Sequence, residues 1–207
     1  MKREEMKMKN KEIRLLNVEL RTPQEDDKMI IEGYAITFNE PATHGYTEII
    51  NEKALDNTDM SDVPLKYNHE DSHLIMARTR NKSLELTKDE KGLKIRAELI
   101  DTQSNKDIYK SIQAGLIDKM SFAFTVRGDE YDYDTDTRTI TDIDKLYDVS
   151  VVDMPFYDTT SVYARNENDE FLTRREEMRK EHEKQLAEEK RKQELKEAKE
   201  KLLAKLG

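Results

Sequence analysis

Apolar residues occur in ten short runs within the first 155 positions, many of them alternating with polar residues, and this is the pattern of β-strands. Alternating or apolar runs occupy residues 13–20, 29–38, 48–50, 63–69, 74–77, 82–87, 93–99, 120–126, 138–143 and 146–152. The stretches between them are mostly short, which favours a closed or barrel-like sheet over alternating βαβ units. Residues 128–137, acidic and rich in tyrosine, are expected to form a loop. We therefore expect a mainly β body.

Helix signals are fewer in this body. Residues 104–114 have a helical apolar spacing, and Ser104 followed by Asp107 resembles an N-terminal capping box. Gly115 then matches a glycine at the end of a helix. A short helix is also expected at residues 52–55. The fold class predicted by these patterns is α+β, mainly β.

A different pattern begins near residue 166. Residues 174–206 contain no glycine or proline and consist mostly of good helix formers, with opposite charges four positions apart, as in Glu176 and Lys180. We expect one long charged helix. Its apolar residues do not keep a heptad spacing, so a solvated single helix, a weak coiled coil and a helix that docks on a partner all remain open.

Length and charge divide the chain in the same way. The 207 residues allow one domain plus an extension, and we expect a flexible N-terminus at 1–12, a domain at 13–165 and a helical extension at 166–207. The extension has 12 acidic and 12 basic residues, so the other 33 acidic and 24 basic residues give the body the whole net charge of −9. An acidic body argues against nucleic acid as the main partner, because phosphate binding needs a basic surface.

The sequence contains no cysteine. This excludes disulfides, thiolate zinc sites and cysteine nucleophiles, and it fits a reducing compartment. No apolar run has the 18 or so residues that span a bilayer. The charged N-terminus has no apolar signal core, so we expect neither secretion nor a membrane partner.

One histidine motif has two interpretations. The five residues from His69 to His73 match H-E-x-x-H, which on a helix places two histidines for zinc. However, residues 63–69 alternate like a strand, and a third ligand would have to come from elsewhere. His69 then ends the apolar face of a strand. A zinc hydrolase using His69 and His73 is the weaker alternative.

Two further residues interrupt apolar strands. Ser121 lies in residues 120–126, on the face opposite to the phenylalanines. Asp148 is a charge within the apolar run 146–152, and a buried charge needs a partner. A histidine held by this carboxylate is one such partner, and an ordinary salt bridge or an exposed face is the alternative.

Several motifs, taken in order, resemble the prohead protease family of tailed bacteriophages, which is related to herpesvirus assemblin. The motifs are Gly33-Tyr34-Ala35, Glu48-Ile49-Ile50, Asn68-His69-Glu70, Met120-Ser121-Phe122-Ala123-Phe124 and Leu146-Tyr147-Asp148-Val149-Ser150-Val151-Val152. Two positions depart from the family pattern. Asp148 stands where glutamate is usual, and Phe156 stands where alanine usually follows the proline.

The resemblance implies a herpesvirus-protease-like closed β-barrel with flanking helices, and a serine endopeptidase of the Ser-His-Asp type. Ser121 would be the nucleophile and His69 its general base. Asp148 would hold the imidazole, with Asp144 as the substitute candidate. No cofactor or metal is implied.

The resemblance also implies partners and a location. The substrates would be the major capsid protein, scaffold segments and the protease's own ends, inside an immature capsid in the host cytoplasm. A homodimer is expected, without nucleic acid or membrane. The alternative is a scaffold-like capsid assembly protein with an inactive protease-like body.

Overall fold

The computed structural model describes residues 11–16, 20–25, 28–43, 45–71, 75–153 and 170–206. The chain divides into two compact units, Met1–Glu167 and Asn168–Gly207. The first is the β-rich body and the second contains the long C-terminal helix. The predicted mainly β, α+β class is confirmed.

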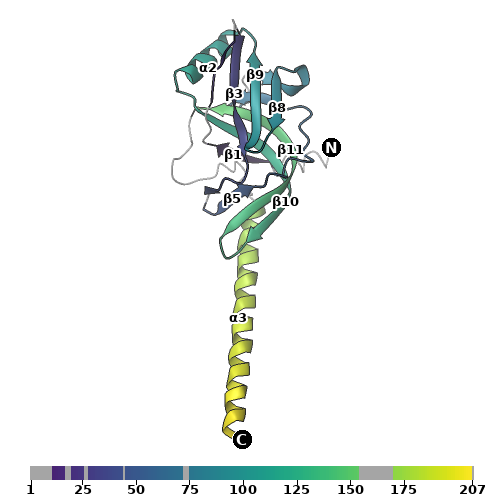
Figure 1. Cartoon of the computed structure of the whole chain (residues 1–207), viewed down its shortest axis with the longest axis vertical. Helices are drawn as coiled ribbons and strands as arrows, with labels where there is room; N and C mark the ends of the chain where they lie inside the picture. The colour runs from purple at the N-terminus through teal and green to yellow at the C-terminus, as the bar shows by residue number, and fades with distance from the viewer. Residues whose placement is uncertain are drawn as a thin grey trace. The chain divides into compact units, whose positions relative to one another are not determined.

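Two sheets form the body (Figure 1). The first sheet has seven strands, β1 (Glu12–Leu16), β4 (Ala42–Thr43), β5 (Thr47–Ile50), β6 (Pro64–Tyr67), β7 (Ala77–Arg78), β10 (Lys119–Asp132) and β11 (Thr137–Val152). The second sheet has four strands, β2 (Gln24–Glu25), β3 (Lys28–Thr37), β8 (Leu84–Lys88) and β9 (Gly92–Leu99). A 3-10 turn, η1 (Thr79–Asn81), and one helix, α2 (Gln103–Gln113), complete the body as far as it is described.

One apolar core joins the sheets. Ile31 and Ile95 of the second sheet belong to the same buried cluster as Phe122 and Val149 of the first. Alternation along the strands produces this core, because every second side chain points to the same face. Strand pairing stays within the two sheets over the described residues, so the closed barrel implied by the resemblance is not found there.

The first sheet is organised around its two longest strands. β10 pairs with β11 along its whole length, and β1 pairs with the other edge of β10. β11 also pairs in parallel with β5 and β6, through different parts of its length. β10 and β11 are therefore the strands that can bring residues distant in sequence to one place.

Three local predictions were wrong. Residues 52–57 form turns, where a short helix was expected. The N-cap of α2 is Thr102, whose hydroxyl accepts the N–H of Asn105 at 3.3 Å, so the capping box was assigned two residues too late. Residues 128–132 and 137 continue β10 and β11, although their acidic composition is typical of a loop.

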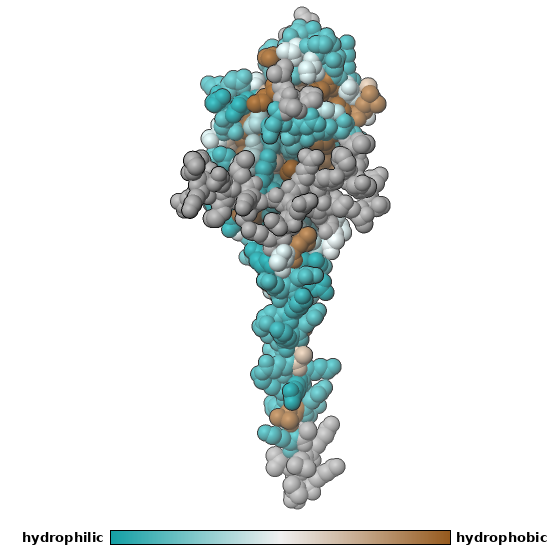
Figure 2. Space-filling model, turned by 180° about the vertical axis from the view of Figure 1, so that it is seen from behind, coloured by the Kyte–Doolittle hydropathy of each residue, from teal (hydrophilic) through white to brown (hydrophobic). Residues whose placement is uncertain are grey.

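The second unit contains α3 (Glu170–Leu206), as the helix-forming composition predicts. The predicted pair of Glu176 and Lys180 lies at 4.0 Å, and Lys192 pairs with Glu188 at 2.8 Å. Figure 2 shows a mostly hydrophilic helix surface with isolated apolar residues. Among the described helices, none combines the length and apolar character needed to cross a bilayer.

Candidate active site

Ser121 lies at the centre of the first sheet. It pairs with Ser150 across β10 and β11, and with Leu15 across β10 and β1. The Ser121 side chain is on the face of β10 opposite to the core residues Phe122 and Phe124, as the alternation predicts. It is nevertheless buried, with 2% of its surface exposed. A polar nucleophile candidate is thus held on rigid, regular backbone.

A register shift sets the direction of Asp148. Asp148 pairs with Ala123, whereas the next pair is Leu146 with Phe124, so Tyr147 is an extra residue on β11. An extra residue of this kind shifts the alternation by one position, so side chains on its two sides no longer follow one alternating pattern. Leu146 therefore joins the apolar core, while Asp148 lies on the other face. Simple alternation would place Leu146 and Asp148 on the same face, and the bulge prevents this.

His69 belongs to a turn, where the sequence pattern predicted a strand. β6 ends at Tyr67, and Asn68 and His69 have φ values of 52° and 56°. The N–H of Glu70 donates to the carbonyl of Tyr67 at 3.0 Å. Two positive φ values inside such a hydrogen bond are the condition of a type I′ turn. The turn moves the imidazole away from the strand face shared by Val63 and Leu65.

Side chains fasten this turn to the end of β11. The amide nitrogen of Asn68 donates to Asp153 at 3.0 Å, and the N–H of Asp153 donates back to the Asn68 side-chain oxygen at 3.3 Å. The Tyr67 hydroxyl also donates to Asp153. Burial, together with the Asp153 carboxylate, raises the pKa of Tyr67 to about 12. Tyr67 therefore remains a neutral donor at ordinary pH.

The turn places the imidazole of His69 between Ser121 and Asp148. The Nε2 atom of His69 lies 2.5 Å from the Oγ atom of Ser121, and its Nδ1 atom contacts Oδ1 of Asp148. Ser150 contacts both His69 and Asp148, with its Oγ atom 3.2 Å from Nδ1 of His69 and 3.1 Å from Oδ1 of Asp148. Lys11 reaches Oδ2 of Asp148 at 3.1 Å. We refer to these five residues as the histidine cluster.

Asp148 is charged in spite of its burial. Removal from water favours the neutral carboxyl, but hydrogen bonding and charge from His69, with a smaller effect of the Lys11 ammonium, outweigh burial. Together they lower the pKa of Asp148 to about 2. A carboxylate in this state favours a proton on Nδ1 of His69, which leaves Nε2 free to act as a base toward Ser121.

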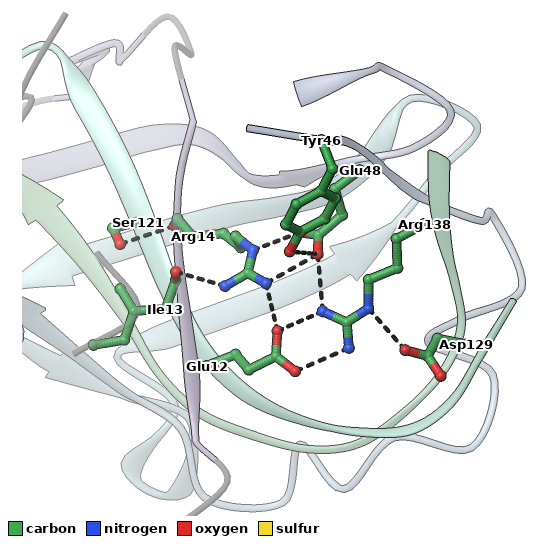
Figure 3. A network of polar contacts seen from close by, with 8 residues as sticks. All are labelled: Glu12, Ile13, Arg14, Tyr46, Glu48, Ser121, Asp129 and Arg138. Atoms are coloured by element: carbon green, nitrogen blue, oxygen red, sulfur yellow. Dashed lines mark hydrogen bonds and ion pairs between the residues drawn. The ribbon is translucent and has the colours of Figure 1, made fainter. Parts of the chain in front are cut away.

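A second polar group, the arginine network, lies next to Ser121 (Figure 3). It consists of Glu12, Arg14, Tyr46, Glu48, Asp129 and Arg138. Arg14 contacts both Glu12 and Glu48, and Arg138 donates to the same two carboxylates at 2.8 and 3.0 Å. Arg14, Glu48 and Arg138 are each less than 5% exposed. Opposite charges thus compensate one another inside the body.

The two groups meet at one atom. The Ser121 hydroxyl lies 2.9 Å from the backbone carbonyl oxygen of Arg14, to which it can donate. A serine hydroxyl has a single hydrogen, and the Nε2 atom of His69 is a second possible acceptor. Rotation about the Cβ–Oγ bond therefore decides whether the hydrogen points to strand β1 or to the imidazole.

The structure brings together three of the four predicted site residues, Ser121, His69 and Asp148. Asp144, the substitute candidate, instead accepts a hydrogen bond from Arg127 at 2.8 Å. The register skips Asp144 as well as Tyr147, so Asp144 and Asp148 do not share a regular strand face.

The zinc interpretation has little support. His69 lies in a turn and not on a helix, and His73 lies outside the described residues. Both ring nitrogens of His69 have partners in the histidine cluster. Among the residues that the structure describes, no group of three or more acidic or histidine side chains could hold a metal ion.

Sequence reasoning missed Ser150, Lys11 and the Arg14 carbonyl. Ser150 had a signal, since it follows Asp148 by two positions and alternation places both on one face. Lys11 had none, because one lysine among many does not reveal a contact across 137 positions. A backbone carbonyl has no sequence signal of its own.

A hydroxyl, an imidazole and a carboxylate in this order are typical of serine hydrolases. The chain belongs to the caudovirus prohead serine protease family, whose family model matches residues 16–175. This confirms the resemblance, and it favours a serine protease over the scaffold and zinc alternatives.

Two individual proteins are similar to this chain. The prohead protease of Enterobacteria phage HK97 is 29% identical over 151 residues, which cover 71% of this chain and 64% of that protein. The chain therefore spans less than two thirds of that relative's length. The bacteriophage T4 capsid assembly protease has 14% identity and a TM-score of 0.45, over 68% of this chain and 98% of that one.

Proposed function

We propose that this protein is a serine endopeptidase of the Ser-His-Asp type that cleaves capsid and scaffold proteins during phage prohead maturation. The observation that supports it most is the contact of one imidazole with both Ser121 and Asp148, in a chain of the prohead serine protease family. The site would act inside the immature capsid, in the host cytoplasm, and could also process the protease's own ends. By family resemblance we propose a homodimer.

The proposed chemistry follows from the positions of the three side chains. Nε2 of His69 takes the proton of Ser121 while Oγ attacks the carbonyl carbon of the scissile peptide bond. The imidazolium is stabilised by the Asp148 carboxylate, and it then gives the proton to the leaving amine. A water molecule, deprotonated by the same imidazole, attacks the acyl-enzyme, releases the acid product and restores Ser121.

The test is replacement of the nucleophile. Ser121→Ala should abolish both cleavage of the major capsid protein, seen by mass spectrometry of its termini, and labelling by a serine-directed fluorophosphonate. Ser111→Ala is a matched control, because the Ser111 hydroxyl donates to the Asp107 carbonyl within α2 at 2.8 Å. Cleavage or labelling that persists in the Ser121 variant, with its fold intact, would show that the nucleophile assignment is wrong.

A further inference from the structure

Ser150 is a buried hydroxyl that the proposed reaction does not use directly. It lies on β11 opposite Ser121 and has no exposed surface. Its Oγ atom is within reach of three atoms, the backbone nitrogen of His69 at 3.2 Å, the Nδ1 atom of His69 at 3.2 Å and Oδ1 of Asp148 at 3.1 Å. One side chain thus contacts the backbone of the base, its ring and the carboxylate.

Counting hydrogens assigns a direction to each contact. Asp148 is ionised and can only accept, so the Ser150 hydrogen points to Oδ1 of Asp148. The Ser150 oxygen then presents only lone pairs to His69, and it accepts the backbone N–H. Toward the ring it can likewise only accept, so it favours the state of His69 in which Nδ1 holds the hydrogen.

The backbone contact matters because of where His69 lies. His69 is in a turn beyond the end of β6, with a positive φ, and the pairing of β6 with β11 ends at Tyr67, two residues before it. Ser150 supplies the acceptor for that N–H from the neighbouring strand β11. The position of the imidazole relative to Ser121 thus depends on the strand to which Ser121 is itself paired.

We infer that Ser150 is a positioning residue, which holds His69 and Asp148 together and keeps the Nδ1 hydrogen on His69. This inference rests on the proposed function, because it gives Ser150 a role at the same site. Ser150 does not touch the reacting atoms in this scheme. Its effect is on the orientation and proton state of the base.

The experiment compares Ser150→Thr with Ser150→Val. These variants have side chains of nearly the same shape, and only threonine keeps the hydroxyl. We expect the maximal rate of Ser121 phosphonylation by a fluorophosphonate to be about 10- to 100-fold lower for Ser150→Val than for Ser150→Thr. The inhibition constant KI should stay the same, because reagent binding does not involve Ser150.

A spectroscopic measurement separates positioning from a loss of packing. The proton between Nδ1 of His69 and Asp148 should give a low-field proton resonance, kept in Ser150→Thr and displaced or broadened in Ser150→Val. Ser83→Ala is the control, because the Ser83 hydroxyl also accepts a backbone N–H, from Arg78 at 2.9 Å, away from the histidine cluster.

Equal phosphonylation rates and identical low-field resonances in the two Ser150 variants would overturn the inference. Failure of the proposed function would look different, because wild-type protein would then not be labelled at Ser121 at all. In that case the resonance comparison would still decide whether Ser150 holds the imidazole and the carboxylate.

Discussion

The histidine cluster and the arginine network are neighbouring polar groups that handle charge in opposite ways. The arginine network buries two guanidinium groups among three carboxylates, and guanidinium groups keep their charge at every ordinary pH. The histidine cluster is centred on an imidazole, whose two ring nitrogens contact Ser121 and Asp148. Fixed charges hold strands in place, whereas an imidazole between a hydroxyl and a carboxylate can accept a proton on one nitrogen and donate from the other.

The two groups also differ in how they depend on the sheet. The arginine network joins β1, β5, β10 and β11 through contacts between side chains, and its backbone contact, from Arg14 to the Ile13 carbonyl, stays within β1. The histidine cluster also uses backbone contacts between different segments, to the N–H of His69 and the carbonyl of Arg14. Changes in either group can therefore affect the Ser121 hydroxyl. The following variants test how far the roles of the two groups can be separated.

The largest effect on stability is expected from Glu48→Gln. Glu48 contacts both Arg14 and Arg138, and its replacement would remove one of the two carboxylates, Glu48 and Glu12, that these buried guanidinium groups share. Breaking a buried ion pair from one side typically costs about 3–5 kcal/mol. Urea unfolding of the whole protein measures this loss.

Glu32→Gln is the matched control for that loss. Glu32 pairs with Arg96 and Lys94 in the second sheet. The side chains of Lys94 and Arg96 are 41% and 34% exposed. An exposed pair of this kind contributes at most about 1 kcal/mol. Similar losses for the two glutamate variants would mean that burial of the arginine network has no special effect.

A smaller effect, dependent on pH, is expected from Asp148→Asn. The pKa of Asp148 is lowered to about 2 in the folded protein, against about 4 for an unfolded chain. The folded state is therefore stabilised by ionised Asp148 above pH 4, and this stabilisation disappears as the pH falls toward 2. The shift corresponds to about 2 kcal/mol.

The measurement is the free energy of unfolding at pH 6 and at pH 2. The difference between these two values should be smaller by about 2 kcal/mol in Asp148→Asn than in the wild type. If this difference between pH 6 and pH 2 is the same in Asp148→Asn and in the wild type, His69 and Lys11 do not favour the charged carboxylate in the folded protein.

The smallest effect is expected from Lys11→Met. This change removes the cation 3.1 Å from Oδ2 of Asp148, one of the groups that lower the pKa of that carboxyl. The pH at which the stabilisation by ionised Asp148 is lost should therefore rise, by less than about one pH unit. Unfolding measured across the acid range gives the displacement.

Lys145→Met is the control for the lysine variant. Lys11 and Lys145 both lie over the Tyr147 ring, at 5.5 and 5.6 Å, but Lys145 pairs with Asp59 at 3.3 Å. Ser61 contributes more than Lys145 to the lowered pKa of Asp59, and the Asp59 side chain is 46% exposed, so the loss of stability in acid should move less than in Lys11→Met. An equal displacement in both variants would point to a general effect of positive charge near Tyr147.

Much of the fold follows from patterns that one strand can show by itself. Alternation placed Phe122 and Phe124 on the face opposite to Ser121, and the structure buries both phenylalanines in the core. The helix-forming composition predicted α3. Bulges could not be predicted in the same way. The extra residue Tyr147 depends on how β11 fits against β10, and this is a property of the pair.

The site was predicted less completely than the fold. Ser121, His69 and Asp148 were selected by their resemblance to a family, since each residue alone has an ordinary structural explanation. The strand predicted through residue 69 ended at Tyr67, because alternation does not reveal a turn made of Asn68 and His69. Contacts such as that of Lys11 with Asp148 arise only when distant segments fold together.

The backbone conformation of His69 has a consequence for the evolution of the sequence at this position. A residue other than glycine in the left-handed region is disfavoured by roughly 1 kcal/mol, and Asn68 and His69 are two in succession. Selection for stability alone would favour glycine at position 69, as at the same place in many type I′ turns. A histidine there opposes the preference of its own backbone. Under the proposed function, stability and activity would therefore favour different residues at this one position.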